Sequence, residues 1–182
     1  GADAGVMISA SHNSVEYNGI KLFSGEGFKL PDSVEEEIEA LILDRPEEIP
    51  LCEGTEVGLI MRRSNAADDY IDYIKKCVGT EMTDINAAFD CANGSSAATA
   101  QRLFTSLGIK GSYIGNAPDG TNINDKCGST HIDKLAEYVK NNSVDVGFAF
   151  DGDADRCLAV DENGNVVDGD RIIAVIAKYL KD

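Results

Sequence analysis

Hydrophobic residues along residues 64–182 follow two spacings in turn, one typical of amphipathic helices and one of buried strands. The helical spacing predicts helices over residues 66–79, 95–108, 130–142 and 171–182. Short apolar runs predict strands over residues 85–94, 111–115 and 144–151, and a hairpin in which 157–161 and 165–167 flank the turn sequence DENGN. Strands that alternate with helices favour βαβ units, so the pattern predicts an α/β fold with a mostly parallel sheet.

The first 63 residues have a less regular pattern. They predict a strand over 5–10, a polar loop over 11–19, a hairpin of 19–23 and 27–31 around SGEG, and a helix over 32–44. Residues 45–58 carry two prolines and a cluster of acids, which indicates a linker. Two of the predicted helices have capping-box spacing at their starts, formed by Ser33 with Glu36 and by Thr130 with Asp133.

Composition narrows the classes of partner. The chain has 32 acidic and 16 basic residues, a net charge of −16, which argues against nucleic acid or an anionic membrane as the main partner. No apolar run approaches the length of about 18 residues that a membrane span needs, so a cytoplasmic location is expected. The five cysteines form no CxxC pair, which favours reduced thiols.

The most informative stretch is DGDADR, which places Asp151, Asp153 and Asp155 between two apolar segments. Alternate positions of an extended loop project to the same side, so the three carboxylates should converge. Carboxylates that lie so close repel one another unless a cation lies among them. Hard oxygen ligands suit Mg²⁺ or Ca²⁺ better than Zn²⁺. The simpler alternative is an acidic surface turn.

A calcium-binding loop of the EF-hand type is a second alternative for this stretch. Asp151, Asp153, Asp155 and Glu162 match loop positions 1, 3, 5 and 12 of that motif. However, Arg156 occupies the position at which an EF-hand needs glycine, and the flanking segments are expected to be strands. These differences make a calcium-binding module the weaker interpretation.

A polar loop near the N-terminus carries the second candidate group, SASHN. Ser11 and His12 are neighbours in sequence, and neighbouring side chains of an extended chain point apart, so a hydrolase-type Ser/His pair is not expected. Two asparagines and Lys21 follow closely. These hydrogen-bond donors and this cation suit a phosphate group.

Three motifs together resemble the α-D-phosphohexomutase superfamily, and most closely its bacterial phosphoglucosamine mutase branch. They are ISASHN with NGIK after it, GTNINDKCGSTH at residues 120–131 and FDGDADR at residues 150–156. The resemblance covers the whole chain. It implies phosphohexomutase-type α/β domains, in which a mixed, mostly parallel sheet is sandwiched between helices.

The resemblance also implies roles for individual residues. Ser11 matches the serine that carries a phosphoryl group. The metal is implied to be Mg²⁺, held by Ser11, Asp151, Asp153 and Asp155. The groups implied to lie at the reacting phosphate and sugar are His12, Lys21 and Arg156, with Lys21 a candidate for proton transfer.

The implied activity is that of an intramolecular phosphotransferase, an isomerase. It would interconvert glucosamine 6-phosphate and glucosamine 1-phosphate through a phosphoserine and a 1,6-bisphosphate, and would supply peptidoglycan precursor synthesis. The implied partner is therefore a phosphorylated hexosamine, and the resemblance allows a homodimer of the full-length protein. Residues 120–131 favour the amino sugar over the alternatives, phosphomannomutase or phosphoglucomutase.

The expected domain organisation follows from the same resemblance. Residues 1–63 would be the C-terminal part of a first domain with the phosphoserine loop, 64–166 a second domain with the metal-binding loop, and 167–182 the start of a third. The chain has no initiator Met and ends on an apolar helix, so a fragment of a longer protein is expected. Such a fragment should be inactive alone, because sugar-recognition and phosphate-binding loops are expected in later domains.

Overall fold

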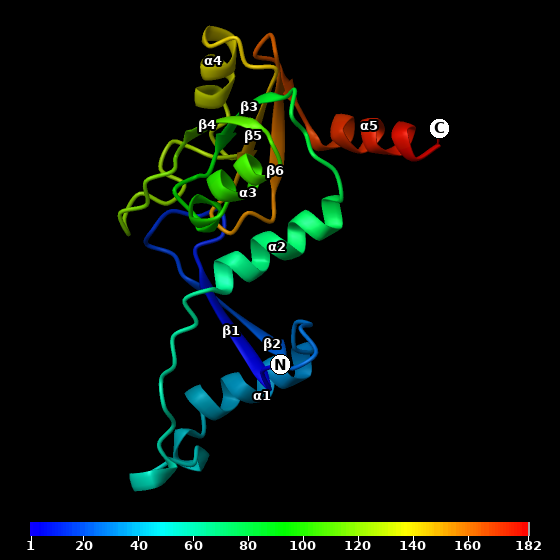
Figure 1. Cartoon of the computed structure of the whole chain (residues 1–182). Coiled ribbons are helices and arrows are strands. Elements are labelled where there is room, and N and C mark those ends of the chain that lie inside the picture. The colour runs from blue at the N-terminus through cyan, green and yellow to red at the C-terminus, as the bar shows by residue number, and fades with distance from the viewer. Residues whose placement is uncertain (182) are drawn as a thin grey trace. The chain divides into compact units, whose positions relative to one another are not determined.

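The computed structural model describes residues 1–181, which divide into two compact units (Figure 1). The first unit consists of Gly1–Ile8 and Gly19–Ser64. The second consists of Ser9–Asn18 and the chain from Asn65 onward. The loop that contains Ser11 therefore belongs to the same unit as the DGDADR segment, although a stretch of the first unit separates the two in sequence.

The first unit is built on a two-stranded sheet and one helix. Its elements are β1 (Ala4–Ser9), β2 (Gly19–Ser24), α1 (Asp32–Leu43) and two 3₁₀ turns, η1 (Pro46–Glu48) and η2 (Gly54–Glu56). The predicted second strand of the SGEG hairpin is reduced to a single antiparallel bridge between Phe23 and Lys29. The predicted linker over 45–58 contains only the two short turns, in agreement with its prolines and acids.

Neither predicted capping box forms, and both predictions were wrong for a local reason. Helix α1 begins directly after Pro31, whose φ of −59° already suits a helix start, so Ser33 lies inside the first turn. Helix α4 (Asp133–Asn141) begins after Ile132, two residues beyond Thr130. No side-chain cap hydrogen bond is present at either start.

The second unit contains a five-stranded mixed sheet in the order β4-β3-β5-β6-β7. The strands are β3 (Asn86–Asp90), β4 (Lys110–Ile114), β5 (Val146–Phe150), β6 (Cys157–Asp161) and β7 (Val166–Val167). Strands β4, β3 and β5 are parallel, whereas β6 and β7 continue the sheet as antiparallel neighbours. The α/β class and the mixed sheet are confirmed, and the three parallel strands are those that the βαβ pattern predicted.

Helices cover both faces of this sheet, so the predicted sandwich is confirmed. Successive β3 residues point to opposite faces: Ala88 packs with Leu135 of α4, whereas Phe89 stacks on Phe104 of α3 (Ala100–Ser106) with ring centroids 3.9 Å apart. Helix α4 approaches β5 closely because Gly147 has no side chain; a Cβ there would lie 2.8 Å from Val139. The result is the three-layer arrangement visible in Figure 1.

The remaining helices are α2 (Ala66–Val78), a 3₁₀ turn η3 (Ser95–Ala98) and α5 (Gly169–Lys181). Ile71 of α2 packs against Leu103 and Leu107 at the end of α3, which adds a further helix to that side of the sheet. Helix α5 exposes the large apolar side chains Ile173, Val175, Ile176, Tyr179 and Leu180. Within residues 1–181, none of the helices has both the length and the hydrophobicity needed to cross a bilayer.

Cysteine reactivity should divide according to burial. Burial raises the pKa of Cys91 and that of Cys127 from 9.0 to about 11, whereas Cys52 and Cys77 are exposed. Because the thiolate is the reactive form, we expect iodoacetamide at pH 8 to modify the exposed pair about a hundredfold faster than the buried pair. Peptide mapping after timed quenching measures these rates, and the same reaction in denaturant is the control. Equal rates at all four thiols in the folded protein would contradict the described core.

Candidate functional site

The carboxyl ends of the parallel strands β3 and β5 bring two loops together at one edge of the sheet. Loop 91–95 follows Asp90 of β3, and loop 151–156, which contains the DGDADR sequence, follows β5. The two loops touch backbone to backbone: the Ser95 N–H donates to the Gly152 carbonyl at 2.8 Å, and a Cβ on Gly94 would lie only 2.3 Å from the same oxygen. Such an edge is where α/β sheets bind ligands.

Asp90 ties this edge to a third loop, formed by residues 121–128. Its carboxylate is fully buried and accepts hydrogen bonds from the N–H of Ala92 at 3.0 Å and of Gly128 at 2.8 Å. Sequence reasoning missed Asp90. The signal was a charged residue at the end of a buried strand, followed at once by the turn sequence CANG.

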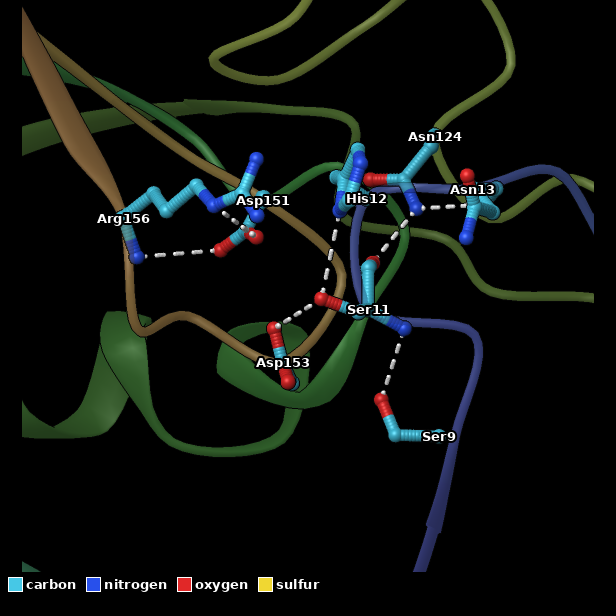
Figure 2. A network of polar contacts seen from close by, with 8 residues as sticks. All are labelled: Ser9, Ser11, His12, Asn13, Asn124, Asp151, Asp153 and Arg156. Carbon is cyan, nitrogen blue, oxygen red and sulfur yellow. Dashed lines mark hydrogen bonds and ion pairs between the residues drawn. The ribbon is translucent and has the colours of Figure 1, made fainter. Parts of the chain in front are cut away.

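The Ser11 loop lies against the same edge. Ser11 adopts a left-handed backbone conformation with φ of 52°. The Ser11 N–H donates to Ser9 Oγ at 2.9 Å, and the Asn13 N–H closes a turn onto the Ala10 carbonyl at 2.9 Å. Figure 2 shows that the Asn124 side chain, from the 121–128 loop, reaches the carbonyls of both Ser11 and Asn13.

The three aspartates converge as predicted and could hold a metal ion. One carboxylate oxygen from each of Asp151, Asp153 and Asp155 lies within 4.8 Å of the others. Asp151 is fully buried, Asp153 is half-buried and Asp155 is exposed. The burial of Asp151 shows that the surface-turn alternative was wrong for this residue.

Asp151 is the member of the triad whose surroundings require a counter-charge. Its Oδ1 accepts a hydrogen bond from the Arg156 N–H at 3.1 Å, but its buried Oδ2 has no hydrogen-bond partner and lies 3.8 Å from Arg156 Nε. Burial, more than the nearby charges of Asp153 and Asp155, raises the pKa of Asp151 above its ordinary value. A buried carboxylate oxygen without a hydrogen bond, in an all-oxygen donor set, fits a hard divalent cation.

The hydroxyl of Ser11 lies beside this triad. Ser11 Oγ is 3.4 Å from Asp153 Oδ1 and 3.4 Å from His12 Nδ1. Both contacts can be followed in Figure 2. Both distances exceed those of strong hydrogen bonds, so the hydroxyl is not held tightly by either neighbour. The expectation that Ser11 and His12 point apart was wrong, because it assumed an extended chain and the backbone at Ser11 is left-handed.

The other predicted site residues have distinct positions. The Arg156 side chain is 55% exposed and borders the triad through Asp151. Lys21 lies on β2 in the first unit, so its role at the site stays a prediction. Glu162 follows β6 and is outside the convergent group of residues that the structure describes. A strand of five residues between the triad and Glu162 is incompatible with the continuous loop of an EF-hand.

A cavity of about 550 Å³ opens beside the Ser11 loop, within the second unit. His12, Lys126 and His131 contribute cationic or titratable groups to its wall, and Glu16 and Asp125 contribute carboxylates. The cavity is large enough for a hexose phosphate and combines groups able to contact both phosphate and hydroxyl oxygens.

Comparisons with known proteins agree with this geometry. Residues 68–164 match the family described as phosphoglucomutase/phosphomannomutase, alpha/beta/alpha domain II, and residues 1–48 match domain I of the same family. The phosphoglucosamine mutase of Clostridium acetobutylicum is 52% identical over 181 residues, which are 100% of this chain and 40% of that protein. The phosphoglucosamine mutase of Clostridium perfringens is 53% identical over 182 residues, which are 100% of this chain and 41% of that protein.

Solved structures give the same result. A phosphoglucomutase/phosphomannomutase family protein of Burkholderia thailandensis superimposes with a TM-score of 0.76 at 25% identity, over 98% of this chain and 38% of that one. A structure of N-acetylphosphoglucosamine mutase from Aspergillus fumigatus in complex with glucose 1,6-bisphosphate superimposes with a TM-score of 0.61 at 19% identity, over 97% of this chain and 47% of that one. At this identity the likeness shows the fold alone. This chain spans about two fifths of the length of its curated relatives. With a family match over more than half of its residues, the chain belongs to the phosphoglucomutase/phosphomannomutase family.

Proposed function

We propose that this chain is the phosphoserine and metal-binding part of a phosphoglucosamine mutase. The observation that carries the proposal is the position of Ser11 Oγ, 3.4 Å from Asp153 Oδ1 of the carboxylate triad. A hydroxyl so placed can carry a phosphoryl group whose oxygen completes the ligand set of a cation. Relatives at 52–53% identity that bear the name phosphoglucosamine mutase support the choice of substrate.

The proposed metal is Mg²⁺, held by Asp151, Asp153, Asp155 and an oxygen on Ser11. When bound, it would offset the negative charge of the transferring phosphoryl group. The donor set supports this choice because carboxylate and phosphate oxygens are the ligands that Mg²⁺ prefers.

In the proposed reaction, phosphorylated Ser11 donates its phosphoryl group to a hydroxyl of glucosamine 6-phosphate. The bond between phosphorus and Ser11 Oγ breaks and a bond to the sugar oxygen forms. The sugar hydroxyl proton passes to a base, for which Lys21 is the candidate, and the released Ser11 Oγ takes up a proton from water. Arg156 is proposed to contact the transferring group, since an exposed guanidinium beside the triad can pair with phosphoryl oxygens. His12, 3.4 Å from Ser11 Oγ, is proposed to hydrogen-bond the same group.

The second half-reaction restores the phosphoserine. The 1,6-bisphosphate turns over in the site, and its 6-phosphoryl group returns to Ser11 Oγ, which leaves glucosamine 1-phosphate. Because Ser11 serves as leaving group in one step and nucleophile in the other, a loosely held hydroxyl fits the role better than one locked in a short hydrogen bond. The cavity lined by His12, Lys126 and His131 offers room for the sugar beside the loop.

The proposed domain organisation assigns residues 1–63 to the first phosphohexomutase domain, 64–166 to the second and 167–182 to the beginning of the third. The family matches over 1–48 and 68–164 support the first two assignments. The exposed apolar face of α5 supports the third, since a helix of this kind needs a partner to cover it.

We expect the protein at its natural full length to prefer the amino sugar. With glucosamine 6-phosphate, kcat/KM should exceed that with mannose or glucose phosphates by about tenfold or more, because groups placed for one substituent discriminate against its absence. A coupled assay of 1-phosphate formation, primed with each 1,6-bisphosphate, measures the ratio. A clear preference for mannose phosphate would replace this proposal with a phosphomannomutase.

A further inference from the structure

Asn124 joins the loop of residues 121–128 to the backbone of the Ser11 loop. Its Nδ2 donates hydrogen bonds to the carbonyls of Ser11 and Asn13, each at 2.8 Å (Figure 2). Asn124 is only 6% exposed, so these contacts are shielded from competing water. Its own N–H donates to the Ala92 carbonyl at 2.8 Å, which fixes the residue to the turn after β3.

The chemistry of the contact specifies asparagine. An amide nitrogen carries two hydrogens, one for each carbonyl, whereas a carboxylate at the same place would put an acceptor against two acceptors. Asn124 also has a left-handed backbone with φ of 57°, which asparagine tolerates better than most residues. Its Oδ1 is buried and has no hydrogen-bond partner among the described residues, so the arrangement carries an energetic cost.

The Ser11 carbonyl lies against two loops. Beside the Asn124 amide, Gly152 of the DGDADR loop approaches so closely that a Cβ there would lie 2.3 Å from the Ser11 carbonyl oxygen and 2.8 Å from Asn124 Nδ2. The backbone of Ser11 is in the strained left-handed region, which persists only where its surroundings hold it. That conformation places Ser11 Oγ 3.4 Å from Asp153.

We propose that Asn124 is a positioning residue for phosphoryl transfer, which acts by holding the Ser11 backbone in the conformation that aims its hydroxyl at the aspartate triad. The inference rests on the proposed function for its effect on catalysis, but the effect on the loop itself does not depend on any activity.

The test compares Asn124→Asp with Asn122→Asp in the protein at its natural full length. Asn122 is a matched control: it lies in the same loop, but its side chain donates from Nδ2 to the Ala117 carbonyl at 2.9 Å and accepts from the Asp119 N–H at 3.1 Å, so it bonds within its own loop region. Hydrogen exchange of the peptide that covers residues 9–18 is followed by mass spectrometry. We expect exchange about tenfold faster in Asn124→Asp, because the loop opens more often, and unchanged exchange in Asn122→Asp.

Steady-state kinetics give the second measurement. In Asn124→Asp we expect kcat to fall about tenfold or more and KM to stay within about twofold of the unsubstituted protein. The reason is that the substitution disturbs the orientation of the phosphoryl donor and not the binding of substrate. Asn122→Asp should retain both constants. If Asn124→Asp does not fold, Asn124→Gly keeps the left-handed backbone and removes only the side chain.

The outcomes separate the two proposals. If the unsubstituted full-length protein has no mutase activity but Asn124→Asp still speeds exchange of the Ser11 loop, the result would support the role of Asn124 in holding that loop and overturn the proposed function. Unchanged exchange of the Ser11 loop in Asn124→Asp would overturn the proposed positioning role of Asn124, whether or not kcat falls. Equal effects of the two substitutions would also overturn it, since they would reflect a general loosening of the 121–128 loop.

Discussion

Replacing Asp151 by asparagine should abolish metal binding and lower mutase activity about a hundredfold or more, and yet stabilise the metal-free protein. The charge of Asp151 is fully buried, its Oδ2 has no hydrogen-bond partner, and two further carboxylates lie close by. A neutral amide of the same size removes this repulsion and keeps an acceptor for the Arg156 N–H, and it gives up only the 3.8 Å ion pair with the half-exposed Arg156 side chain. We expect the free energy of unfolding in EDTA to rise by about 1 kcal/mol.

Chemical denaturation in EDTA and calorimetric titration with Mg²⁺ measure the two effects separately. Glu162→Gln is the control, because Glu162 lies outside the convergent group and should leave Mg²⁺ binding unchanged. A loss of metal affinity in Glu162→Gln would return the calcium-loop interpretation to consideration. Undiminished Mg²⁺ binding by Asp151→Asn would mean that the triad is not the metal site.

Ser11→Ala should remove mutase activity below detection, because the variant lacks the atom that carries the phosphoryl group. Ser33→Ala, which changes an exposed serine of helix α1 in the first unit, should remain active and serves as the control. Phosphorylation should also alter metal affinity: a phosphoserine adds a charge of about −1.5 to −2 next to carboxylates that already repel one another. We expect the phosphorylated protein to bind Mg²⁺ about tenfold more tightly than the dephosphorylated form.

Intact-mass analysis identifies the two phosphorylation states, and calorimetry on each gives the Mg²⁺ affinities. The reciprocal experiment follows from linkage: with a bisphosphate as phosphoryl donor, Mg²⁺ should shift the equilibrium of Ser11 toward the phosphorylated form. Equal Mg²⁺ affinities in the two states would show that Ser11 and the aspartates do not share a site, and the proposed mechanism would then fail.

Much of the fold could be predicted because the spacing of hydrophobic residues along the chain indicates which side chains are buried. Strand β5 and helix α4 follow their apolar patterns closely, and Leu135 and Val139 of α4 are completely buried as the pattern indicates. The ends of helices were harder to predict. Ser33 and Thr130 have suitable chemistry for caps, but Pro31 and Ile132 decide where the helices begin, and that depends on how the preceding turn packs.

The candidate site also has features that could be predicted from the sequence and features that could not. The three aspartates lie within one short loop, so their convergence could be predicted from the local chain geometry. The contact between Ser11 and His12 could not, because it requires a left-handed residue that nothing in the local sequence demands. The contact of Asn124 was also hidden, since its partners are backbone carbonyls more than a hundred positions away and carry no signature of residue type.

The backbone contacts at Gly94 and Gly152 restrict how the specificity of this protein could be redesigned. Neither position can accept even a methyl group without moving a neighbouring main chain, so the loops beside the aspartate triad offer no room for new side chains at these two positions. Residues that line the adjoining cavity, such as Lys126 and His131, are better positions for substitution. A library that seeks a different sugar should therefore sample that wall and leave both glycines unchanged.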